Sequence, residues 1–339
     1  MIPYGKQDIS NQDIEAVIEV LKSDFVTQGP KVPEFENSIK KYCNVKKALA
    51  VNSATSGLHV ACLALGVGSG DIVWTSAVTF AASSNCALYC GANVDFIDID
   101  PCSYNLSTQD LEQKLRIAKK NKALPKAVIP VHLTGQSCDM KKIYELSKEY
   151  NFKIIEDASH AIGGEYNGKK IGSCEYSDIT VFSFHPVKII TTGEGGMVNT
   201  NDKFLAEKMD LFRTHGITKD SNIMQSKFSE PWYYEQLNLG LNYRLTDIQA
   251  ALGLSQMKRL DSFICKRKEI AKRYDLNLSK LPVRLPAQAE NINSSWHLYV
   301  IRVNKDSHRT IFEFLRNNGV GVNLHYIPVY KHPYYTSLG

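Results

Sequence analysis

The first 200 residues contain seven short runs rich in apolar and β-branched residues. These runs predict strands at Lys47–Ser53, Asp71–Ser76, Asn93–Ile99, Lys126–Leu133, Phe152–Asp157, Asp178–Phe184 and Gly195–Thr200. Helical periodicity separates several of them, most clearly at Ser107–Asn121 and Asp139–Tyr150. Alternating strands and helices predict an α/β fold with a mainly parallel seven-stranded sheet that is covered on both faces. The last run follows its neighbour too closely for a long crossover helix, so we expect it to be antiparallel.

The pattern changes near Arg244, where one long helical stretch begins. A smaller α+β unit is predicted after it, with a strand-like run at Trp296–Val303, a helix at Ser307–Asn318 ended by Gly319, and the segment Val320–Val329. We therefore expect a large domain over residues 1–243 and a smaller C-terminal domain over residues 244–339.

Composition and charge exclude several classes of protein. No run of about 18 apolar residues predicts a transmembrane helix, and the N-terminus does not resemble a secretory signal, so we expect a cytoplasmic protein without a membrane partner. The net charge of +5 is mild and spread along the chain, which does not indicate nucleic-acid binding. The eight cysteines are scattered without a CxxC pair, so we expect free thiols and no metal site.

The residues that suggest chemistry follow predicted strands of one sheet, where open α/β sheets bind ligands. Lys188 follows the sixth predicted strand among apolar residues, and burial there favours a neutral, nucleophilic amine. Asp157 ends the fifth strand, where it is either a turn or cap residue or the partner of a pyridinium nitrogen. Thr55 and Ser56 begin a helix, where their hydroxyls either cap it or bind a phosphate. With Phe80 as a flat group, these residues together suggest a pyridoxal phosphate site.

Five segments in order carry a specific family resemblance: "NSATSGLH", "TFAASSN", "IIEDASHAIGGEYNGKKIGS", "VFSFHPVKIITTGEGG" and "LNYRLTDIQAALGLSQMKRL". As a set they resemble the sugar aminotransferases of the DegT/DnrJ/EryC1/StrS family, and the resemblance runs from about Ile2 to the end of the chain. The resemblance implies the aspartate aminotransferase-like fold, known as fold type I, with pyridoxal 5′-phosphate as the cofactor. It further implies a homodimer whose active sites are shared between subunits.

The resemblance also implies roles for individual residues. Lys188 is the Schiff-base lysine, Asp157 faces the pyridine nitrogen and His160 lies near the 3-hydroxyl group or the ring. Phe80 stacks on the ring, while Thr55, Ser56 and Ser183 bind the phosphate, which Asn242 reaches from the neighbouring subunit. The implied substrate side, to which residues 1–30 contribute, consists of Tyr4, Thr27, Gln28, Gly29, Asn323, His325 and Tyr326; packing in the small domain is the alternative for His325 and Tyr326.

More narrowly, "SDFVTQGPKVPEFE" and "PVHLTGQSCDM" are similar to the family branch that serves pseudaminic acid biosynthesis. This similarity implies transamination of a UDP-linked 4-keto-6-deoxy sugar with L-glutamate as donor. The alternatives are an aminotransferase for another 4-keto or 3-keto nucleotide sugar and a non-catalytic pyridoxal-binding protein. A dehydrase of the same family would carry a histidine where this chain has Lys188. Family members continue for a few dozen residues past the segment matching "YKHPYYTSLG", so we expect a truncated small domain.

Overall fold

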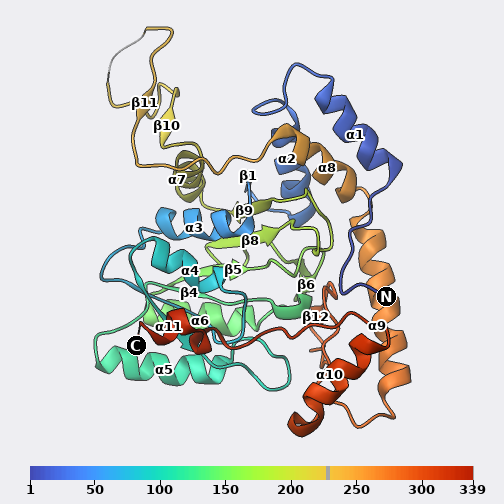
Figure 1. Cartoon of the computed structure of the whole chain (residues 1–339). Helices are drawn as coiled ribbons and strands as arrows, with labels where there is room; N and C mark the ends of the chain where they lie inside the picture. The colour runs from blue at the N-terminus through green and yellow to red at the C-terminus, as the bar shows by residue number, and fades with distance from the viewer. Residues whose placement is uncertain (227–229, 339) are drawn as a thin grey trace.

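A seven-stranded sheet forms the centre of the computed structural model, which describes residues 1–226 and 230–338 (Figure 1). Its strands are β1 Lys47–Val51, β2 Ile72–Ser76, β3 Asn93–Ile97, β4 Ala127–Ile129, β5 Lys153–Asp157, β8 Ile179–Ser183 and β9 Gly196–Thr200. Each lies within a range predicted from the sequence, so the mainly parallel sheet is confirmed. The structure does not describe residues 227–229 and 339, which fall inside the ranges expected for the two domains.

The strands are arranged in the order β1-β9-β8-β5-β4-β2-β3. The neighbours from β8 to β3 pair in parallel, whereas β9 is antiparallel to both β8 and β1. The antiparallel orientation predicted for this last strand is therefore confirmed. It follows from the connection between β8 and β9, which contains no crossover helix and instead carries Lys188.

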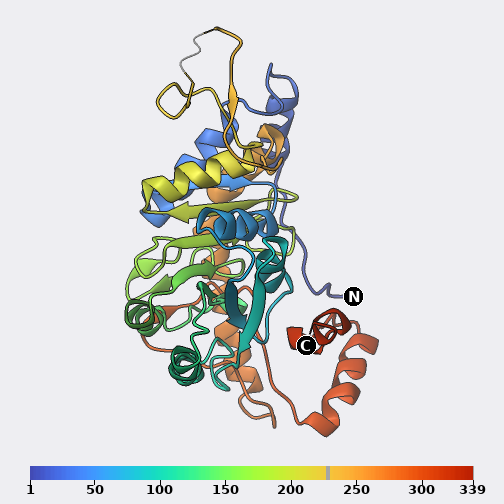
Figure 2. The same cartoon turned by 90° about the vertical axis from the view of Figure 1, so that its left-hand side faces the viewer.

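Helices cover both faces of the sheet (Figures 1 and 2). One apolar cluster lies under α3 Ala54–Ala64, α4 Ala82–Tyr89 and α7 Lys203–Arg213. The clusters of the opposite face lie under α2 Lys31–Cys43, α5 Thr108–Lys120, α6 Met140–Tyr150, α8 Asp247–Met257 and α9 Leu260–Leu278. Successive residues of one strand belong to different faces, as Ile154 and Ile155 show. Each strand has consecutive apolar residues and so contributes to both faces, although β3 and β5 also contain charged residues.

Smaller elements surround this core. They are α1 Asn11–Leu21, η1 Leu133–Gly135, β6 Glu165–Tyr166, β7 Lys169–Lys170, β10 Ile217–Thr218, β11 Glu235–Gln236, β12 Ile292–Asn293, η2 Lys305–Ser307, α10 His308–Asn317, η3 Val329–Lys331 and α11 Pro333–Thr336. The β10–β11 pair projects from the body beyond α7 (Figure 1). In Figure 2 the N-terminal segment runs down towards the C-terminal helices. Its Ile2 N–H donates to the carbonyl oxygen of Gly319 at 2.7 Å.

The sequence predicted one long helix from Arg244, but the structure has two, because α8 ends at Met257 and α9 begins at Leu260. Arg259, at the interruption, donates hydrogen bonds to Asp8 at 2.9 Å and to Asp13 at 2.6 Å. The turn lets Arg259 reach these carboxylates of the N-terminal segment while Leu260 stays in the core.

The strand predicted at Trp296–Val303 is also wrong. In the described residues its strand-like pairing is limited to one bridge, between Arg302 and Arg284. The Ser295 and Leu298 N–H groups donate instead to carbonyl oxygens of η1, and an irregular segment results. A strand needs a continuous neighbour for its backbone groups, and local β propensity does not supply one. The predicted helix before Gly319 is confirmed as α10.

None of the helices in residues 1–226 and 230–338 combines the length and the apolar character needed to cross a membrane. The eight cysteines are all free thiols, of which Cys102 and Cys265 are exposed.

Candidate active site

The ends of β5 and β8 meet the beginning of α3 at one edge of the sheet. Asp157 is the last residue of β5 and Ser183 is the last residue of β8. Ser183 pairs with Gly196 of β9, and a Cβ atom on Gly196 would lie 2.8 Å from the backbone of Ser53 and Ala54. Gly196 therefore allows the first turn of α3 to lie directly against β9, which brings Thr55 and Ser56 to this edge.

Lys188 lies in the connection that follows β8 and is partly buried. Burial lowers the pKa of its amine from the ordinary value of 10.5 to about 8, although the nearby Asp157 carboxylate opposes this shift. Burial disfavours the charged form of a lysine, and a neutral amine is a nucleophile and a base. The structure thus gives Lys188 the environment that its apolar sequence context predicted.

Asp157 is only 4% exposed and accepts two hydrogen bonds. Ser83 Oγ donates to Oδ2 at 2.7 Å, and the Ser159 N–H donates to Oδ1 at 3.1 Å. The bond from Ser159 belongs to the local turn that was one of the predicted alternatives for Asp157. The bond from Ser83 joins residues that are far apart in the chain. Both bonds hold the carboxylate in one orientation. Sequence reasoning missed Ser83, although it lies in the "TFAASSN" segment that also supplies Phe80.

The start of α3 offers donors for an anion. Ser53 is the N-cap, and its Oγ accepts the Ser56 N–H at 3.1 Å. The Ser56 hydroxyl donates to Asn52 Oδ1 at 2.5 Å, so the helix cap, one of the predicted alternatives, comes from Ser53. The N–H groups of Ala54 and Thr55 belong to the first helical turn, whose N–H groups have no partner within the helix. With the positive end of the helix dipole, they suit a phosphate group.

Aromatic side chains line the solvent side of this edge. Phe80 is 61% exposed, and its ring lies 6.3 Å from the ring of Tyr326. Tyr4 stacks on His325 with ring centroids 5.2 Å apart, and its hydroxyl lies 2.7 Å from His325 Nε2. The contacts of Ile2 with residues 319–321 bring the N-terminal segment to this position. The structure therefore brings Tyr4 to His325 and Tyr326, which lie more than 300 positions away in the sequence.

Two buried histidines lie beside Lys188. His160 and His297 have ring centroids 4.3 Å apart. Burial lowers the pKa of both well below 6.5, and the charge of Lys188 adds to the shift, so both imidazoles are neutral at pH 7. The Thr134 N–H donates to His160 Nδ1 at 3.3 Å, which leaves the proton of the neutral ring on Nε2. Sequence reasoning did not select His297, which lies in the segment wrongly predicted as a strand.

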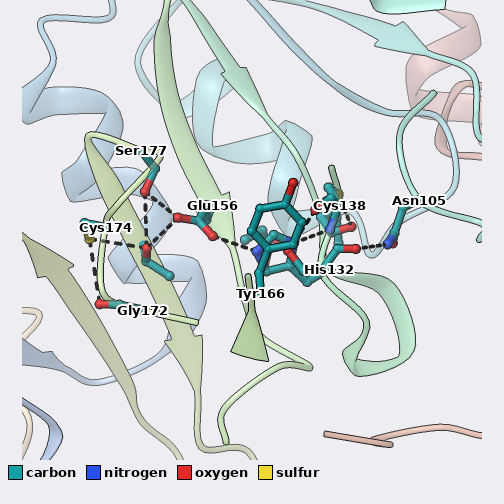
Figure 3. A network of polar contacts seen from close by, with 12 residues as sticks. Asn105, His132, Cys138, Glu156, Tyr166, Gly172, Cys174 and Ser177 are labelled. Carbon is teal, nitrogen blue, oxygen red and sulfur yellow. Dashed lines mark hydrogen bonds and ion pairs between the residues drawn. The ribbon is translucent and has the colours of Figure 1, made fainter. Parts of the chain in front are cut away.

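A buried polar network supports the strand that carries Asp157 (Figure 3). Glu156 points to the opposite face of β5, where it accepts hydrogen bonds from Ser177 and Thr180 and pairs with His132 Nε2 at 2.7 Å. Burial alone would raise the pKa of Glu156, but these partners outweigh it and the pKa is lowered. The network ties β5 to β4 and β8 directly below the site, which fixes the position of Asp157.

Most of the other predicted site residues are exposed. Thr27 and Gln28 are exposed beside Gly29, whose N–H donates to Asp247 at the start of α8, at 2.7 Å. Asn323 is exposed, and so is Asn242, whose carbonyl oxygen accepts a hydrogen bond from Asn52 at 3.3 Å. No hydrogen bond or ring contact within residues 1–226 and 230–338 joins these side chains to Lys188. Their predicted roles in substrate binding and across a subunit interface stay predictions.

The residues that lie together fit pyridoxal phosphate. The start of α3 supplies donors for the phosphate, and the buried Asp157 supplies a carboxylate for the ring nitrogen. Lys188 supplies an amine with a lowered pKa, and the exposed face of Phe80 supplies a surface for the ring.

Comparison with known proteins gives consistent results. The model of the DegT/DnrJ/EryC1/StrS aminotransferase family matches residues 7–339. The chain is 42% identical to a Campylobacter jejuni protein named UDP-4-amino-4,6-dideoxy-N-acetyl-β-L-altrosamine transaminase, over 100% of this chain and 87% of that relative.

Solved structures share the fold at lower sequence identity. Helicobacter pylori PseC, described as an aminotransferase of pseudaminic acid biosynthesis, superimposes with a TM-score of 0.90 at 34% identity, covering 99% of this chain and 88% of PseC. The PLP form of the putative sugar aminotransferase Spr1654 from Streptococcus pneumoniae gives a TM-score of 0.88 at 30% identity, covering 100% of this chain and 88% of Spr1654.

Proposed function

Because this chain belongs to the DegT/DnrJ/EryC1/StrS aminotransferase family, we propose that it transfers the amino group of L-glutamate to the C4 ketone of a UDP-linked 4-keto-6-deoxy sugar. The proposed acceptor is UDP-2-acetamido-2,6-dideoxy-β-L-arabino-hex-4-ulose. The products are then UDP-4-amino-4,6-dideoxy-N-acetyl-β-L-altrosamine and 2-oxoglutarate, a step of pseudaminic acid biosynthesis. The name of the Campylobacter jejuni relative supports this choice of sugar. The partly buried amine of Lys188 is the observation that carries amino transfer.

The cofactor is pyridoxal 5′-phosphate, which supplies an aldehyde that accepts the amino group and a ring that withdraws electrons from the reacting carbon. Ser56, Ser183 and the first turn of α3 would hold its phosphate, together with Thr55. Asp157 would hold the proton on its ring nitrogen, because a neighbouring carboxylate raises the pKa of a cation. Phe80 would cover one face of the ring.

Lys188 is the general base and acid in this proposal. With a pKa of about 8, roughly a tenth of its amine is neutral at pH 7, whereas fewer than about one in a thousand ordinary lysines are neutral at that pH. The neutral Nζ would remove the proton from Cα of the amino donor and deliver it to the aldehyde carbon of the cofactor within the same half-reaction. In the opposite half-reaction it would move a proton from that carbon to C4 of the sugar. His160 presents Nε2–H as a donor, and we place this donor towards the 3-hydroxyl oxygen of the cofactor.

We propose residues 1–243 as the cofactor-binding domain and residues 244–339 as a long helical stretch followed by a smaller domain. Lys188, Asp157 and the start of α3 all lie in the first range. The contacts between Ile2 and residues 319–321 support a contribution of residues 1–30 to the substrate side.

Replacing Ser83 with alanine tests how the Asp157 carboxylate is held. The change removes a 2.7 Å hydrogen bond to a buried carboxylate, and we expect turnover to fall about tenfold to a hundredfold, because hydrogen bonds to charged groups contribute about 1.5–3 kcal/mol. Ser84→Ala is the matched control, since Ser84 bonds to Ala81 and Tyr335 rather than to Asp157. Equal losses in the two variants would contradict this role of Ser83. Steady-state rates of 2-oxoglutarate formation provide the measurement.

We also propose a homodimer in which Asn242 reaches the cofactor phosphate of the neighbouring subunit. Its exposed side chain supports this role, as do exposed apolar residues on α1 and near β11, namely Ile14, Ile18, Leu21, Trp232, Tyr234 and Leu239. Mixed Lys188→Ala and Asn242→Ala subunits should recover activity, because one site of each mixed dimer contains both native residues. Activity that stays at the level of the separate variants would contradict a shared site.

Identification of the product tests the function itself. The cofactor-loaded protein is incubated with L-glutamate and a panel of UDP-, dTDP- and GDP-linked 4-keto and 3-keto sugars, and each product is identified by NMR. We expect the C4 amine of the altrosamine configuration from the UDP-linked L-arabino ketone. Faster amination of another sugar would assign a different substrate to the protein within the same family. No amination of any sugar would favour a non-catalytic pyridoxal-binding protein.

A further inference from the structure

A pocket of about 360 Å³ opens beside Lys188 and lies between α9, the N-terminal segment and residues 296–299. Of the described residues that line it, Lys6, Lys188, Lys266 and Arg267 are basic, and Asp8 is the one carboxylate. Asp8 already forms an ion pair with Arg259 at 2.9 Å. The pocket therefore has a surplus of positive charge next to the reactive amine.

Arg267 is the most unusual of these cations, because it is partly buried and has no acidic partner in the part of the chain that the structure describes. Its Nη1 donates to the carbonyl oxygens of Trp296 at 3.0 Å and His297 at 3.1 Å. Burial lowers the pKa of the guanidinium group, and no carboxylate compensates for it. A guanidinium group has five N–H donors, and its remaining donors suit a planar carboxylate.

His297 provides a second, independent indication of a ligand. It lines the same pocket, is only 7% exposed, and its Nδ1 has no hydrogen-bond partner in the described residues. Buried polar atoms are normally hydrogen-bonded, so an unpaired one beside a cavity points to a polar group that binds there.

We propose that this pocket receives the side-chain carboxylate of a dicarboxylic amino donor, with Arg267 as its main partner and Lys6 and Lys266 adding positive charge. The proposal rests on the amino-transfer function proposed above and specifies which residues select the donor. A donor bound in this way carries its carboxylate towards Arg267 while its amino carbon stays near Lys188. His297 Nδ1 offers a further hydrogen-bonding atom to the same group.

The size of the pocket favours an amino acid over the nucleotide of the sugar substrate. The volume lies at the lower end of the range for small-molecule sites, and a UDP-sugar, with a base, two sugar rings and two phosphates, is several times larger than glutamate. The aromatic rings in the wall pack on one another, with Tyr299 5.7 Å from Trp296 and 4.9 Å from Tyr274. We therefore expect Arg267 to act on the donor half-reaction alone.

Replacing Arg267 with glutamine tests the proposal. The probe is glutarate, a dicarboxylate that has no amino group to transfer, and its dissociation constant for the cofactor-loaded protein is measured by calorimetry. We expect Arg267→Gln to weaken glutarate binding and to raise the KM for L-glutamate, each about tenfold to a hundredfold, as for the loss of a charged hydrogen bond. The KM for the keto sugar should stay within about twofold. Arg273→Gln, an exposed position on the same helix, is the matched control.

A second variant covers the case in which Arg267→Gln fails to fold. Lys6 and Lys266 are exposed, so the double change Lys6→Gln and Lys266→Gln should leave the fold intact and weaken glutarate binding several-fold.

Unchanged glutarate binding in folded variants would overturn the proposal, as would a loss of binding confined to UDP or to the keto sugar. If wild-type protein aminates a sugar but the variants use glutamate normally, this inference fails and the proposed function stands. If wild-type protein accepts no dicarboxylic donor, the proposed function itself fails.

Discussion

Lys188→Ala should reduce amino transfer by at least about 10⁴-fold while the protein remains folded. The substitution removes both the nucleophile and the group that moves the proton at Cα, and general acid–base catalysis alone contributes about 10²–10⁴-fold. The rate of 2-oxoglutarate formation from L-glutamate measures the effect. Lys208→Ala, which changes an exposed lysine of α7, is the matched control and should keep the wild-type rate. A Lys188→Ala variant that turned over at the wild-type rate would show that the lysine is misassigned.

Lys188 should also affect how the stability of the cofactor-free protein depends on pH. The pKa of Lys188 is about 8 in the folded chain, below its ordinary value of 10.5, so the unfolded chain binds more protons between these values. The free energy of unfolding therefore rises with pH between about 8 and about 10.5, as the penalty for burying the charged amine disappears. We expect the melting temperature of Lys188→Met to exceed that of the wild type at pH 7, and the difference to shrink across this window. A difference that grew with pH would contradict the lowered pKa.

Asp157→Asn should bind the cofactor but lose about 10²- to 10⁴-fold in turnover. Asparagine nearly preserves the volume of the side chain but removes the charge that would keep the ring nitrogen protonated, so the ring withdraws electrons less strongly. It also presents an NH2 group to Ser83 or Ser159, each of which now donates to the carboxylate. Rates and the dissociation constant of the cofactor are measured separately. Full activity with normal cofactor binding would refute this role of Asp157.

Glu156→Gln provides the contrast for Asp157→Asn on the same strand. Glu156 belongs to the network with His132, Ser177 and Thr180 on the other face of β5 (Figure 3). We expect its replacement mainly to lower the melting temperature, because a buried hydrogen-bonded charge is lost from the core. A larger loss of turnover in Glu156→Gln than in Asp157→Asn would reverse the assignment of the two neighbouring carboxylates.

The accuracy of the sequence-based predictions differs between the two halves of the chain. Each of the seven central strands contains consecutive apolar residues, and this pattern locates them because a sheet covered on both faces needs such residues. Trp296–Val303 has equal β propensity, but its backbone binds η1 instead of a neighbouring strand. Propensity is a local property, whereas strand pairing depends on which segment lies alongside.

For the candidate site, the motifs in the sequence predicted Lys188, Asp157, Thr55, Ser56 and Phe80, and the resemblance extended the set. They did not identify Ser83 as the partner of Asp157, nor His297 and Arg267 beside Lys188. These residues carry no spacing signal relative to the groups they accompany, because the chain brings them together only after β5, β8 and α9 have packed. Ser83 was present in a quoted motif, but nothing local connects it with a carboxylate in another segment.

The sequence by itself determined the seven strands of the central sheet, the position of a lysine in an apolar stretch, and the identity of the family. These features follow from periodicity and residue type along short segments. The tertiary structure decided which side chains share an environment: the pKa of Lys188, the bond from Ser83 to Asp157, and the pairing of Tyr4 with His325. Burial and electrostatic interaction depend on distance in space, and residues far apart in the sequence acquire that distance only when the chain folds.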